Sequence, residues 1–357
     1  MPGPLDGVRV ADFSRVLAGP YCTQVLADLG ADVVKVERPG SGDDTRTWGP
    51  SYFLGLNRGK RSVVLDLKDA EGLALARTLV ERADVVVESF RPGVLDRLGL
   101  DRAANPTAVW CHVTAFGDAD LPGYDLLLQA LGGLMHVTGE PDGPPLKVGA
   151  AVIDLVCGLH AAVGVLAGLR SRDGADVEVT LMDSALVSLV NQASAWLNEG
   201  ASPTRMGNRH PAIAPYETFG DLAIACGNDA MFARLCDVLG LDGLAADPCF
   251  ATNDARVAHR DELHDRIAGA LTEGVDWAAR LNGAGVPAGR VNDVPGAFAF
   301  AGELGLEPVW ELDGVRTVRS PLRGLASPTS RPPELGEHTD EVVSLLRRAP
   351  GGSSWGA

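Results

Sequence analysis

The sequence predicts an α/β protein with a parallel sheet, followed by a smaller and mostly helical domain. Strand and helix patterns alternate from the first residues onward, and the valines at 85–87 form an uninterrupted apolar strand. Such alternation is typical of parallel sheets, whose strands are apolar throughout when both faces are covered. A third observation is a polar segment at 199–215, after which the pattern changes. A length of 357 residues has room for two such domains.

The first elements form a βαβ unit. Segment 7–13 predicts a strand, and Pro20 then falls in the first turn of a helix, where its missing N–H is no loss. Apolar residues at helical spacing continue this helix as far as Gly30, which ends it. Segment 32–37 predicts the next strand. A helix joins the two strands, so they are expected to be parallel.

The same alternation continues to residue 198, and a second region follows the linker. Further strands are predicted at 62–67, 84–89, 108–116 and 176–181, and further helices at 71–81, 124–134, 154–172 and 183–198. After the linker the patterns predict a short strand from Tyr216 and helices near 230–239, 254–271 and 275–284. The chain then returns through a loop from Pro295 to a final helix at 337–348, and residues 350–357 are predicted to be a frayed tail.

Charge and cysteine content disfavour several classes of protein. The chain has 31 Lys and Arg against 47 Asp and Glu, a net charge of −16 that disfavours binding to nucleic acid or anionic membranes. No apolar run is long enough to cross a membrane, and the first residues do not resemble a signal peptide. Six cysteines without a Cys-x-x-Cys pair indicate reduced thiols, a cytoplasmic location and no metal site.

Common nucleotide-binding and hydrolase motifs are missing from the sequence. The first strand–helix turn, 14–20, has one glycine where a dinucleotide-binding turn has three. Segment 55–62 is one residue too short for a P-loop, and no Gly-x-Ser-x-Gly motif occurs. A nicotinamide or flavin enzyme, a P-loop NTPase and a serine hydrolase are therefore disfavoured.

A basic stretch stands out against the acidic background. Segment 35–61 contains six Lys or Arg and three Asp or Glu, with glycines that allow its backbone to wrap an anion. Arg38, Lys68 and Arg91 follow three successive predicted strands, and ligands of parallel sheets lie beyond the carboxyl ends of the strands. The stretch predicts either an anion-binding edge or an ordinary solvated loop; the residues alone do not decide between them.

Asp154 stands before the long apolar helix predicted from the next residue. The ordinary interpretation is an N-cap, in which its carboxylate accepts hydrogen bonds from free backbone N–H groups. A helix N-terminus also favours negative charge, so Asp154 is expected to be ionised at neutral pH. An ionised carboxylate in an apolar environment can act as a nucleophile, which is the chemical alternative to the N-cap.

Ten segments, in order along the chain, resemble one known family. They are Leu5–Asp12, Ala18–Pro20, Leu26–Pro39, Gly42–Asp43, Asn57–Ser62, Leu65–Lys68, Ser89–Val94, Gly123–Asp125, Arg205–Pro211 and Asn253–Arg256. Together they resemble the class III CoA-transferases, the family of carnitine CoA-transferase and formyl-CoA transferase. The resemblance covers nearly the whole chain to about residue 295.

The resemblance implies a site, a fold and a reaction. The family's nucleophilic aspartate falls on Asp154, and its CoA contacts and thioester-lining residues fall on Arg38, Leu65, Lys68, Ser89, Phe90, Arg91, Arg97, Tyr124 and Asp125. It implies a doubly wound large domain at 1–198 and 295–357, the linker 199–215 and a small α+β domain at 216–294. Two chains are expected to interlock as rings in a homodimer. The reaction is that of EC 2.8.3.-: CoA moves from an acyl-CoA to a small carboxylic acid through an aspartyl anhydride and an aspartyl-CoA thioester. CoA is then a cosubstrate, and no permanent cofactor is expected.

The sequence departs from the family at several places, and two alternatives stay open. Leu17 replaces an active-site glutamine of formyl-CoA transferase, and Pro122 replaces a CoA-binding lysine. Segments 117–124 and 218–221 are shorter than usual. A 2-methylacyl-CoA racemase shares the implied fold, but its histidine position is occupied here by Tyr124. A catalytically silent CoA-binding protein is the other alternative, which retention of Asp154 disfavours.

Overall fold

The computed structural model describes residues 3–171, 173–328 and 330–348, and the predicted tail at 350–357 lies outside these ranges. The chain divides into two compact units. Unit 1 contains the described parts of 1–134, 147–201 and 307–357, and unit 2 contains 135–146 and 202–306. The domain boundaries drawn from the sequence stay predictions; these units differ from them in grouping 135–146 and 295–306 with unit 2.

A parallel sheet of six strands forms the centre of unit 1, so the predicted α/β class is confirmed. Its strands are β1 (Arg9–Phe13), β2 (Asp32–Glu37), β3 (Lys60–Val64), β4 (Val85–Glu88), β5 (Val109–Thr114) and β6 (Ala175–Thr180). They are arranged in the order β3-β2-β1-β4-β5-β6. Because the chain first builds outward from β1 to β3 and then resumes beside β1 with β4, the direction of winding reverses between these two central strands.

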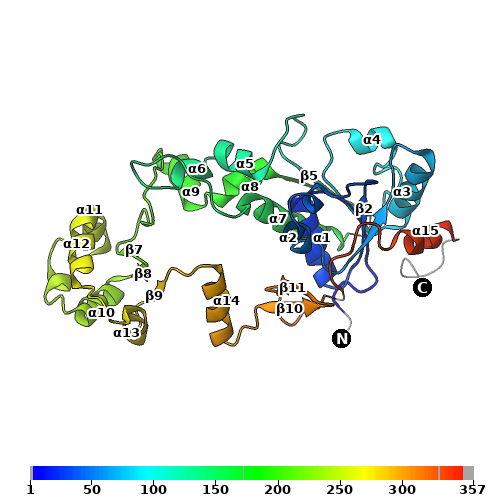
Figure 1. The fold of residues 1–357 in the computed structure, drawn as a ribbon. Coiled ribbons are helices and arrows are strands. Elements are labelled where there is room, and N and C mark those ends of the chain that lie inside the picture. Colours follow the sequence, from blue (N-terminus) through cyan, green and yellow to red (C-terminus); the bar gives the residue numbers. More distant parts are fainter. Residues whose placement is uncertain (1–2, 172, 329, 349–357) are drawn as a thin grey trace. The chain divides into compact units, whose positions relative to one another are not determined.

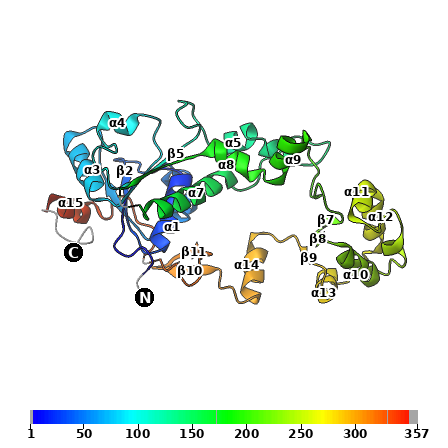
Figure 2. The ribbon, with the colours of Figure 1, turned by 180° about the vertical axis from the view of Figure 1, so that it is seen from behind.

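Helices cover both faces of this sheet (Figures 1 and 2). Alternate residues of each strand point to opposite faces, so Val85 and Val87 join one apolar core and Val86 joins the other. The first core includes residues of α1 (Ala18–Asp28) and α7 (Val152–Gly168). The second includes residues of α3 (Ala70–Arg82) and α15 (Thr339–Arg347). The continuous apolar run at 85–87 therefore reflects burial on both faces.

The C-terminal helix belongs to the same unit as the N-terminal sheet. Val342 and Leu346 of α15 are buried in the core that also contains Val63 of β3 and Leu79 of α3. The backbone N–H of His338 donates to the carbonyl of Ser62, which ties the start of α15 to β3. Residues from both ends of the chain thus build one hydrophobic core.

The other elements of unit 1 are short. They are η1 (Asp44–Arg46), α2 (Pro50–Leu54), α4 (Val94–Leu98), α5 (Asp125–Leu131), α8 (Leu181–Ser188), α9 (Asn191–Glu199), β10 (Val309–Leu312) and β11 (Val315–Val318). The single helix predicted at 183–198 is wrong: α8 and α9 are separated near Val190, whose φ of 44° is incompatible with a continuing helix. The hairpin of β10 and β11 was not predicted.

Unit 2 combines a small antiparallel sheet with helices. The sheet has the order β7 (Tyr216–Phe219), β8 (Leu222–Ala225), β9 (Ala288–Arg290). The helical elements are α10 (Asp229–Leu239), η2 (Leu244–Ala246), α11 (Asn253–Ala258), α12 (Arg260–Ala270), α13 (Trp277–Gly283) and α14 (Val294–Glu303), and α6 (Leu134–Val137) lies at the boundary. The loop predicted from Pro295 is wrong, because α14 occupies that segment and Asp293 caps it. No helix among the described residues is long and apolar enough to span a membrane.

Candidate functional site

A cavity of about 260 Å³ lies at the carboxyl ends of β1, β4 and β5. Its wall consists of Arg15–Gly19, Asp44, Ser89–Pro92, Val113–Ala115, Gly117, Ala119, Leu121–Tyr124, Asp154 and Leu181. The central strands β1 and β4 flank the point where the winding of the sheet reverses. Ligands of open α/β sheets bind at this topological position, because the loops that leave the two strands turn in opposite directions and open a crevice.

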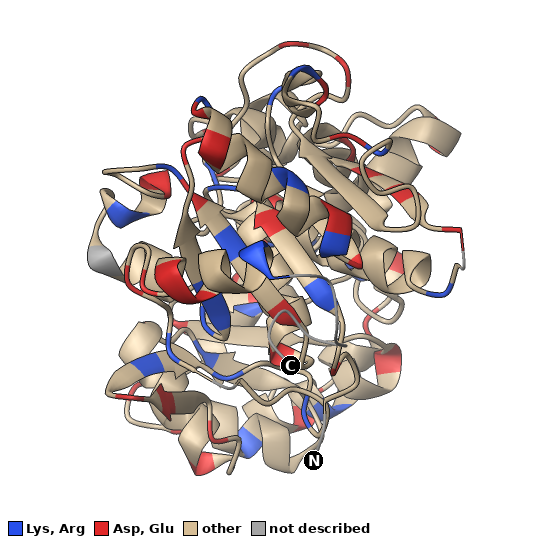
Figure 3. Cartoon of the chain, turned by 90° about the vertical axis from the view of Figure 1, so that its right-hand side faces the viewer, with Lys and Arg blue, Asp and Glu red and all other residues tan. Residues whose placement is uncertain are grey.

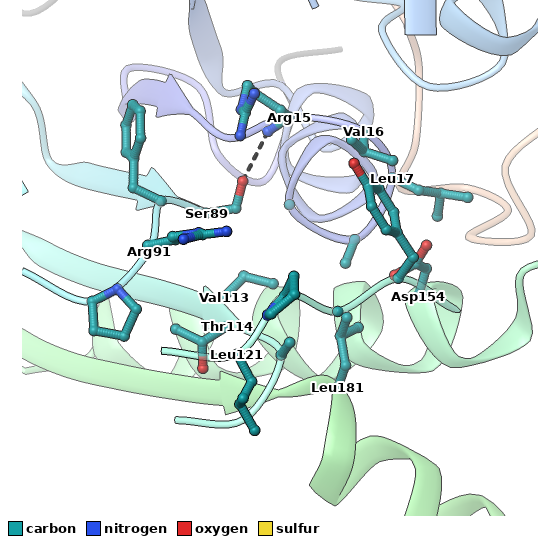
Figure 4. Close-up of a pocket in the computed structure, with 18 of the residues that line it drawn as sticks. Arg15, Val16, Leu17, Ser89, Arg91, Val113, Thr114, Leu121, Asp154 and Leu181 are labelled. Atoms are coloured by element: carbon teal, nitrogen blue, oxygen red, sulfur yellow. Dashed lines mark hydrogen bonds between the residues drawn. The ribbon is translucent and has the colours of Figure 1, made fainter. Parts of the chain in front are cut away.

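The cavity has a cationic end and a carboxyl end (Figure 4). Arg15, Ser89 and Arg91 lie together at the cationic end, whereas Leu17 and Asp154 lie at the other. The backbone N–H of Arg15 donates to Ser89 Oγ at 3.0 Å, which joins the loops after β1 and β4. Arg91 is largely exposed and lies 3.6 Å from Asp120, so its guanidinium is accessible to an anion from solvent.

Asp154 is the third residue of α7, and its side chain is almost completely buried. The N-cap predicted for it is wrong: the N-cap position is Ala151, which has no side chain to accept a hydrogen bond. Asp125 of α5 supplies the missing acceptor, because its Oδ1 receives the N–H of Ile153 at 2.8 Å and the N–H of Asp154 at 3.3 Å. The carboxyl of Asp154 therefore remains available to the cavity.

Burial, and to a smaller extent the neighbouring carboxylate of Asp125, raise the pKa of Asp154 to about 7. The expectation that Asp154 is ionised throughout the neutral range is therefore wrong. The first turn of α7 does favour negative charge, but that stabilisation is smaller than the hydration free energy that a carboxylate loses when it is buried. At pH 7 the protonated and ionised forms of Asp154 are present in comparable amounts.

Three aromatic side chains lie together, and one of them, Tyr124, lines the cavity. The ring of Trp48 lies 5.7 Å from that of Tyr52 and 6.3 Å from that of Tyr124, measured between centroids. Burial raises the pKa of Tyr52, and the charges of Asp154 and Asp125 raise it further, which places its hydroxyl in their field. Tyr52 was not singled out in the sequence, where a tyrosine inside a short helix carries no pattern of its own.

The structure brings together only some of the residues predicted to bind CoA. Ser89, Phe90, Arg91, Tyr124 and Asp154 line the cavity. Five others do not: Asp125 caps α7, Leu65 is buried in the core, Lys68 and Arg97 are exposed, and Arg38 pairs with Asp44. Arg15 lines the cavity but was missed, although it follows β1 as Arg38 follows β2. Arg15 reaches the cavity because β1 lies in the middle of the sheet, and the order of the strands is not visible in the sequence.

The basic stretch at 35–61 does not form an open anion cradle. All six of its cations pair with carboxylates of unit 1, and five of them are largely buried: Lys35 with Asp43, Arg46 with Glu37, Arg58 with Asp28, Lys60 with Asp12 and Arg61 with Asp32. Only Arg38 remains half-exposed, and it pairs with Asp44. Figure 3 shows the acidic positions interspersed with the basic ones along the chain. The local charge excess left an anion-binding edge and a solvated loop open; these side chains instead mainly neutralise buried carboxylates.

No cluster of three or more His, Cys, Asp or Glu side chains suited to a metal ion occurs among residues 3–171, 173–328 and 330–348. The chemistry that the site offers comes from a carboxyl of raised pKa, guanidinium groups and a neighbouring hydroxyl.

Comparison with known proteins agrees with this geometry. Residues 5–339 match CoA-transferase family III. The chain is 42% identical to a succinate–glutarate CoA-transferase of Agrobacterium fabrum, over 96% of each chain, and 39% identical to an acetyl-CoA:oxalate CoA-transferase of Acetobacter aceti, over 97% of this chain and 95% of that one. The crystal structure of a CAIB/BAIF family protein from Brucella suis superposes with a TM-score of 0.85 at 41% identity, covering 97% of this chain and all of that one. The chain therefore belongs to CoA-transferase family III, and it is an enzyme that transfers CoA between an acyl-CoA and a carboxylic acid.

Proposed function

We propose that Asp154 is the covalent nucleophile of this transfer. The observation that supports it is the position of a buried carboxyl at one end of a cavity whose other end carries two arginines. CoA is a polyanion that carries its reactive sulfur at the end of an uncharged arm. A cavity with cations at one end and a nucleophile at the other suits such a molecule.

The first half of the reaction loads CoA onto the enzyme. The ionised Asp154 attacks the carbonyl carbon of the acyl-CoA thioester, the C–S bond breaks, and a mixed anhydride and CoA thiolate result. The thiolate then attacks the aspartyl carbonyl of the anhydride. The donor acid leaves as its carboxylate, and Asp154 becomes an aspartyl-CoA thioester.

The second half repeats these steps in reverse order with the acceptor. Its carboxylate attacks the aspartyl-CoA carbonyl and expels CoA thiolate, which forms a second mixed anhydride. The thiolate attacks the acceptor's own carbonyl, which gives the new acyl-CoA and returns the Asp154 carboxylate. Each step exchanges one activated acyl group for another, so ATP is not consumed and the reaction is freely reversible.

We assign the CoA side of the cavity to Arg91, Ser89 and Phe90, and the thioester side to Tyr124. Arg38, Leu65, Lys68 and Arg97, which lie outside the cavity wall, are kept as proposed contacts of the nucleotide end of CoA. Asp125 is proposed to hold the first turn of α7 in place, because it accepts the N–H of Asp154.

The acceptor is proposed to be a short dicarboxylic acid. Relatives at 35–42% identity are named for succinate, glutarate, oxalate and mesaconate. The acceptor needs only one carboxylate for the chemistry, so the second serves recognition. Arg15, which lines the cavity and lies 3.1 Å from Asp44, is a donor suited to it.

The active form is proposed to be the interlocked homodimer. Large apolar side chains are exposed along the helices of unit 1, including Leu126, Leu131, Leu159, Val163, Leu186, Val187, Trp196 and Leu197. An apolar surface of this kind on an isolated chain is typical of an interface. Light scattering coupled to size exclusion should give twice the mass of one chain; a monomer at micromolar concentration would contradict the proposal.

Trapping of the enzyme intermediate tests the mechanism. The protein is incubated with succinyl-CoA, treated with hydroxylamine or borohydride, and digested for mass spectrometry. A modified Asp154 is expected, and the variant Asp154→Asn should show neither label nor turnover. Exchange of the substrate's α-proton without any label would support a racemase instead. CoA binding without label or exchange would support a silent binding protein.

A further inference from the structure

The turn that lines the cavity after β1 contains a strained residue. Val16 has a φ of 70°, a region that β-branched residues rarely adopt because Cβ crowds the backbone. A conformation of this kind persists only where the surrounding structure enforces it, and such residues concentrate at functional sites. Val16 and the three residues after it form one wall of the cavity.

A buried ion pair behind the turn holds this conformation. Asp43 accepts the backbone N–H of Val16, with its two carboxylate oxygens at 3.4 and 3.3 Å. Lys35 Nζ lies 2.9 Å from Asp43 Oδ2 and donates to the carbonyl of Ser14 at 2.8 Å. The two side chains thus bind the backbone on both sides of Arg15, and neither of them lines the cavity. Asp43 and Lys35 are 1–2% exposed, so solvent does not compete for these bonds.

Further contacts support Asp43 itself. Its Oδ1 accepts the N–H of Thr45 at 2.9 Å and the hydroxyl of Thr45 at 2.8 Å. The positive charge of Lys35 and these hydrogen bonds keep the pKa of Asp43 below its ordinary value despite burial. The carboxylate is therefore charged over the pH range in which the enzyme would work, and its orientation is fixed.

The turn is also coupled to the helix that carries Asp154. A Cβ on Gly158, one turn of α7 beyond Asp154, would lie 2.5 Å from the carbonyl oxygen of Ala18, so the two backbones are in direct contact. On the other side, a Cβ on Gly19 would overlap the side chain of Ser14. A change in the backbone at 14–18 would therefore shift the wall of the cavity relative to Asp154.

We propose that Asp43, paired with Lys35, is a positioning residue of the transferase: it holds the strained turn at Val16 and thereby sets the distance between the cavity wall and Asp154. The proposal rests on the function assigned to Asp154. The buried pair of Asp43 and Lys35 lies outside the cavity wall, and the resemblance to the family does not by itself give the pair a role.

The first test compares two buried ion pairs of similar burial. Asp43→Asn keeps an oxygen for the N–H of Val16 but removes the charge that pairs with Lys35. Asp28→Asn does the same to the buried pair of Asp28 and Arg58. Asp28 is the last residue of α1, about 15 Å along the helix from the residues that line the cavity. Both variants should unfold at lower temperature, but only Asp43→Asn should lower kcat, on the order of tenfold to a hundredfold at equal folded fraction.

Hydrogen exchange gives a readout that does not depend on activity. In Asp43→Asn the amides of residues 15–19 should exchange faster than in the wild type, while those of β4 stay protected. In Asp28→Asn the amides of residues 15–19 should be unchanged. Thr45→Val, which removes only the hydroxyl donor to Asp43, is the milder variant if Asp43→Asn does not fold, and about threefold lower kcat is expected for it.

Strain relief separates positioning from a general loss of structure. Val16→Gly removes the Cβ that makes the positive φ costly, so the turn needs less enforcement. Asp43→Asn should then lower kcat by a smaller factor in the Val16→Gly background than in the wild type. Equal factors in both backgrounds, or unchanged kcat and exchange in folded Asp43→Asn and Thr45→Val, would overturn the proposal. If instead the wild type forms no adduct on Asp154, the proposed function fails first.

Discussion

Replacement of Asp154 by asparagine should stabilise the folded protein at alkaline pH while it abolishes turnover. The ordinary pKa of the carboxyl is 3.8, and burial together with Asp125 raises it to about 7. The folded state therefore binds more protons than the unfolded chain between these two values, and the folded protein loses stability as the pH rises through that window. The full cost of ionising Asp154 is about 4 kcal/mol above pH 7, as three factors of ten in the proton equilibrium imply.

The neutral amide of Asp154→Asn has a similar shape and carries no charge, so the variant avoids this cost. Urea unfolding at pH 5 and pH 8 measures it directly. The free energy of unfolding of the variant should exceed that of the wild type by about 3 kcal/mol more at pH 8 than at pH 5, because only part of the cost has developed at pH 5. CoA transfer should fall to background at both pH values, since the amide cannot form the anhydride.

The exposed Asp242 supplies the control, because it lies outside the cavity on the surface of unit 2. In Asp242→Asn the free energy of unfolding should change between pH 5 and pH 8 by the same amount as in the wild type. If the stability of Asp154→Asn relative to the wild type is the same at pH 5 and at pH 8, the raised pKa is refuted. A variant that is less stable than wild type at pH 8 would refute the conclusion that the ionised carboxylate is poorly solvated.

Other variants test the remaining features of the site. The pH–rate profile of the wild type should rise through about pH 7 as Asp154 ionises, and Asp125→Asn should move this limb to lower pH because it removes the neighbouring charge; a limb that stays in place would contradict the coupling. Arg91→Ala should raise KM for acyl-CoA about tenfold with a smaller effect on kcat. A fall in kcat as large as the rise in KM would indicate a role beyond binding. Gly158→Ala should lower the melting temperature through about 1–3 kcal/mol of overpacking, because its methyl group meets the Ala18 carbonyl; an unchanged melting temperature would show that α1 and α7 separate easily.

The sheet was predictable because its signals are local. The limits of β2 and α3 agree with the predicted strand at 32–37 and helix at 71–81 to within one residue at each end, since apolar periodicity and caps such as Asp69 mark them directly. The break near Val190 was not predictable, because valine is not a residue type that ends helices. The start of α14 was overlooked although Asp293 and Pro295 are ordinary helix-start residues.

The chemistry of the site was only partly predictable, because it depends on partners that are distant in sequence. Asp154 was found by its position before an apolar helix and by the resemblance. Its pKa, however, depends first on burial by the surrounding elements and then on Asp125, which lies on another helix. The basic stretch shows the limit of counting charges: its excess suggested an anion-binding edge or a solvated loop, but Lys35 and Lys60 each stand within a strand and meet a buried carboxylate. A sequence shows which residues of a segment are charged, but it does not show which side chains elsewhere in the fold pair with them.

The burial that makes Asp154 costly to ionise also bears on its covalent chemistry. In the free enzyme above pH 7 the cavity holds a poorly solvated negative charge, at a cost of about 4 kcal/mol. An anhydride or a thioester at Asp154 is uncharged, so formation of either intermediate removes that charge from the protein and places it on a departing thiolate or carboxylate. The site therefore favours the covalent states over the free carboxylate, and the advantage disappears at low pH, where Asp154 is already neutral. The aspartyl-CoA enzyme should therefore have a higher free energy of unfolding than the free enzyme, and this difference should be larger at pH 8 than at pH 5. The effect of CoA binding alone is measured with Asp154→Asn, which binds CoA without forming the thioester, and is subtracted. Equal differences at the two pH values would show that the buried charge does not contribute to the stability of the intermediate.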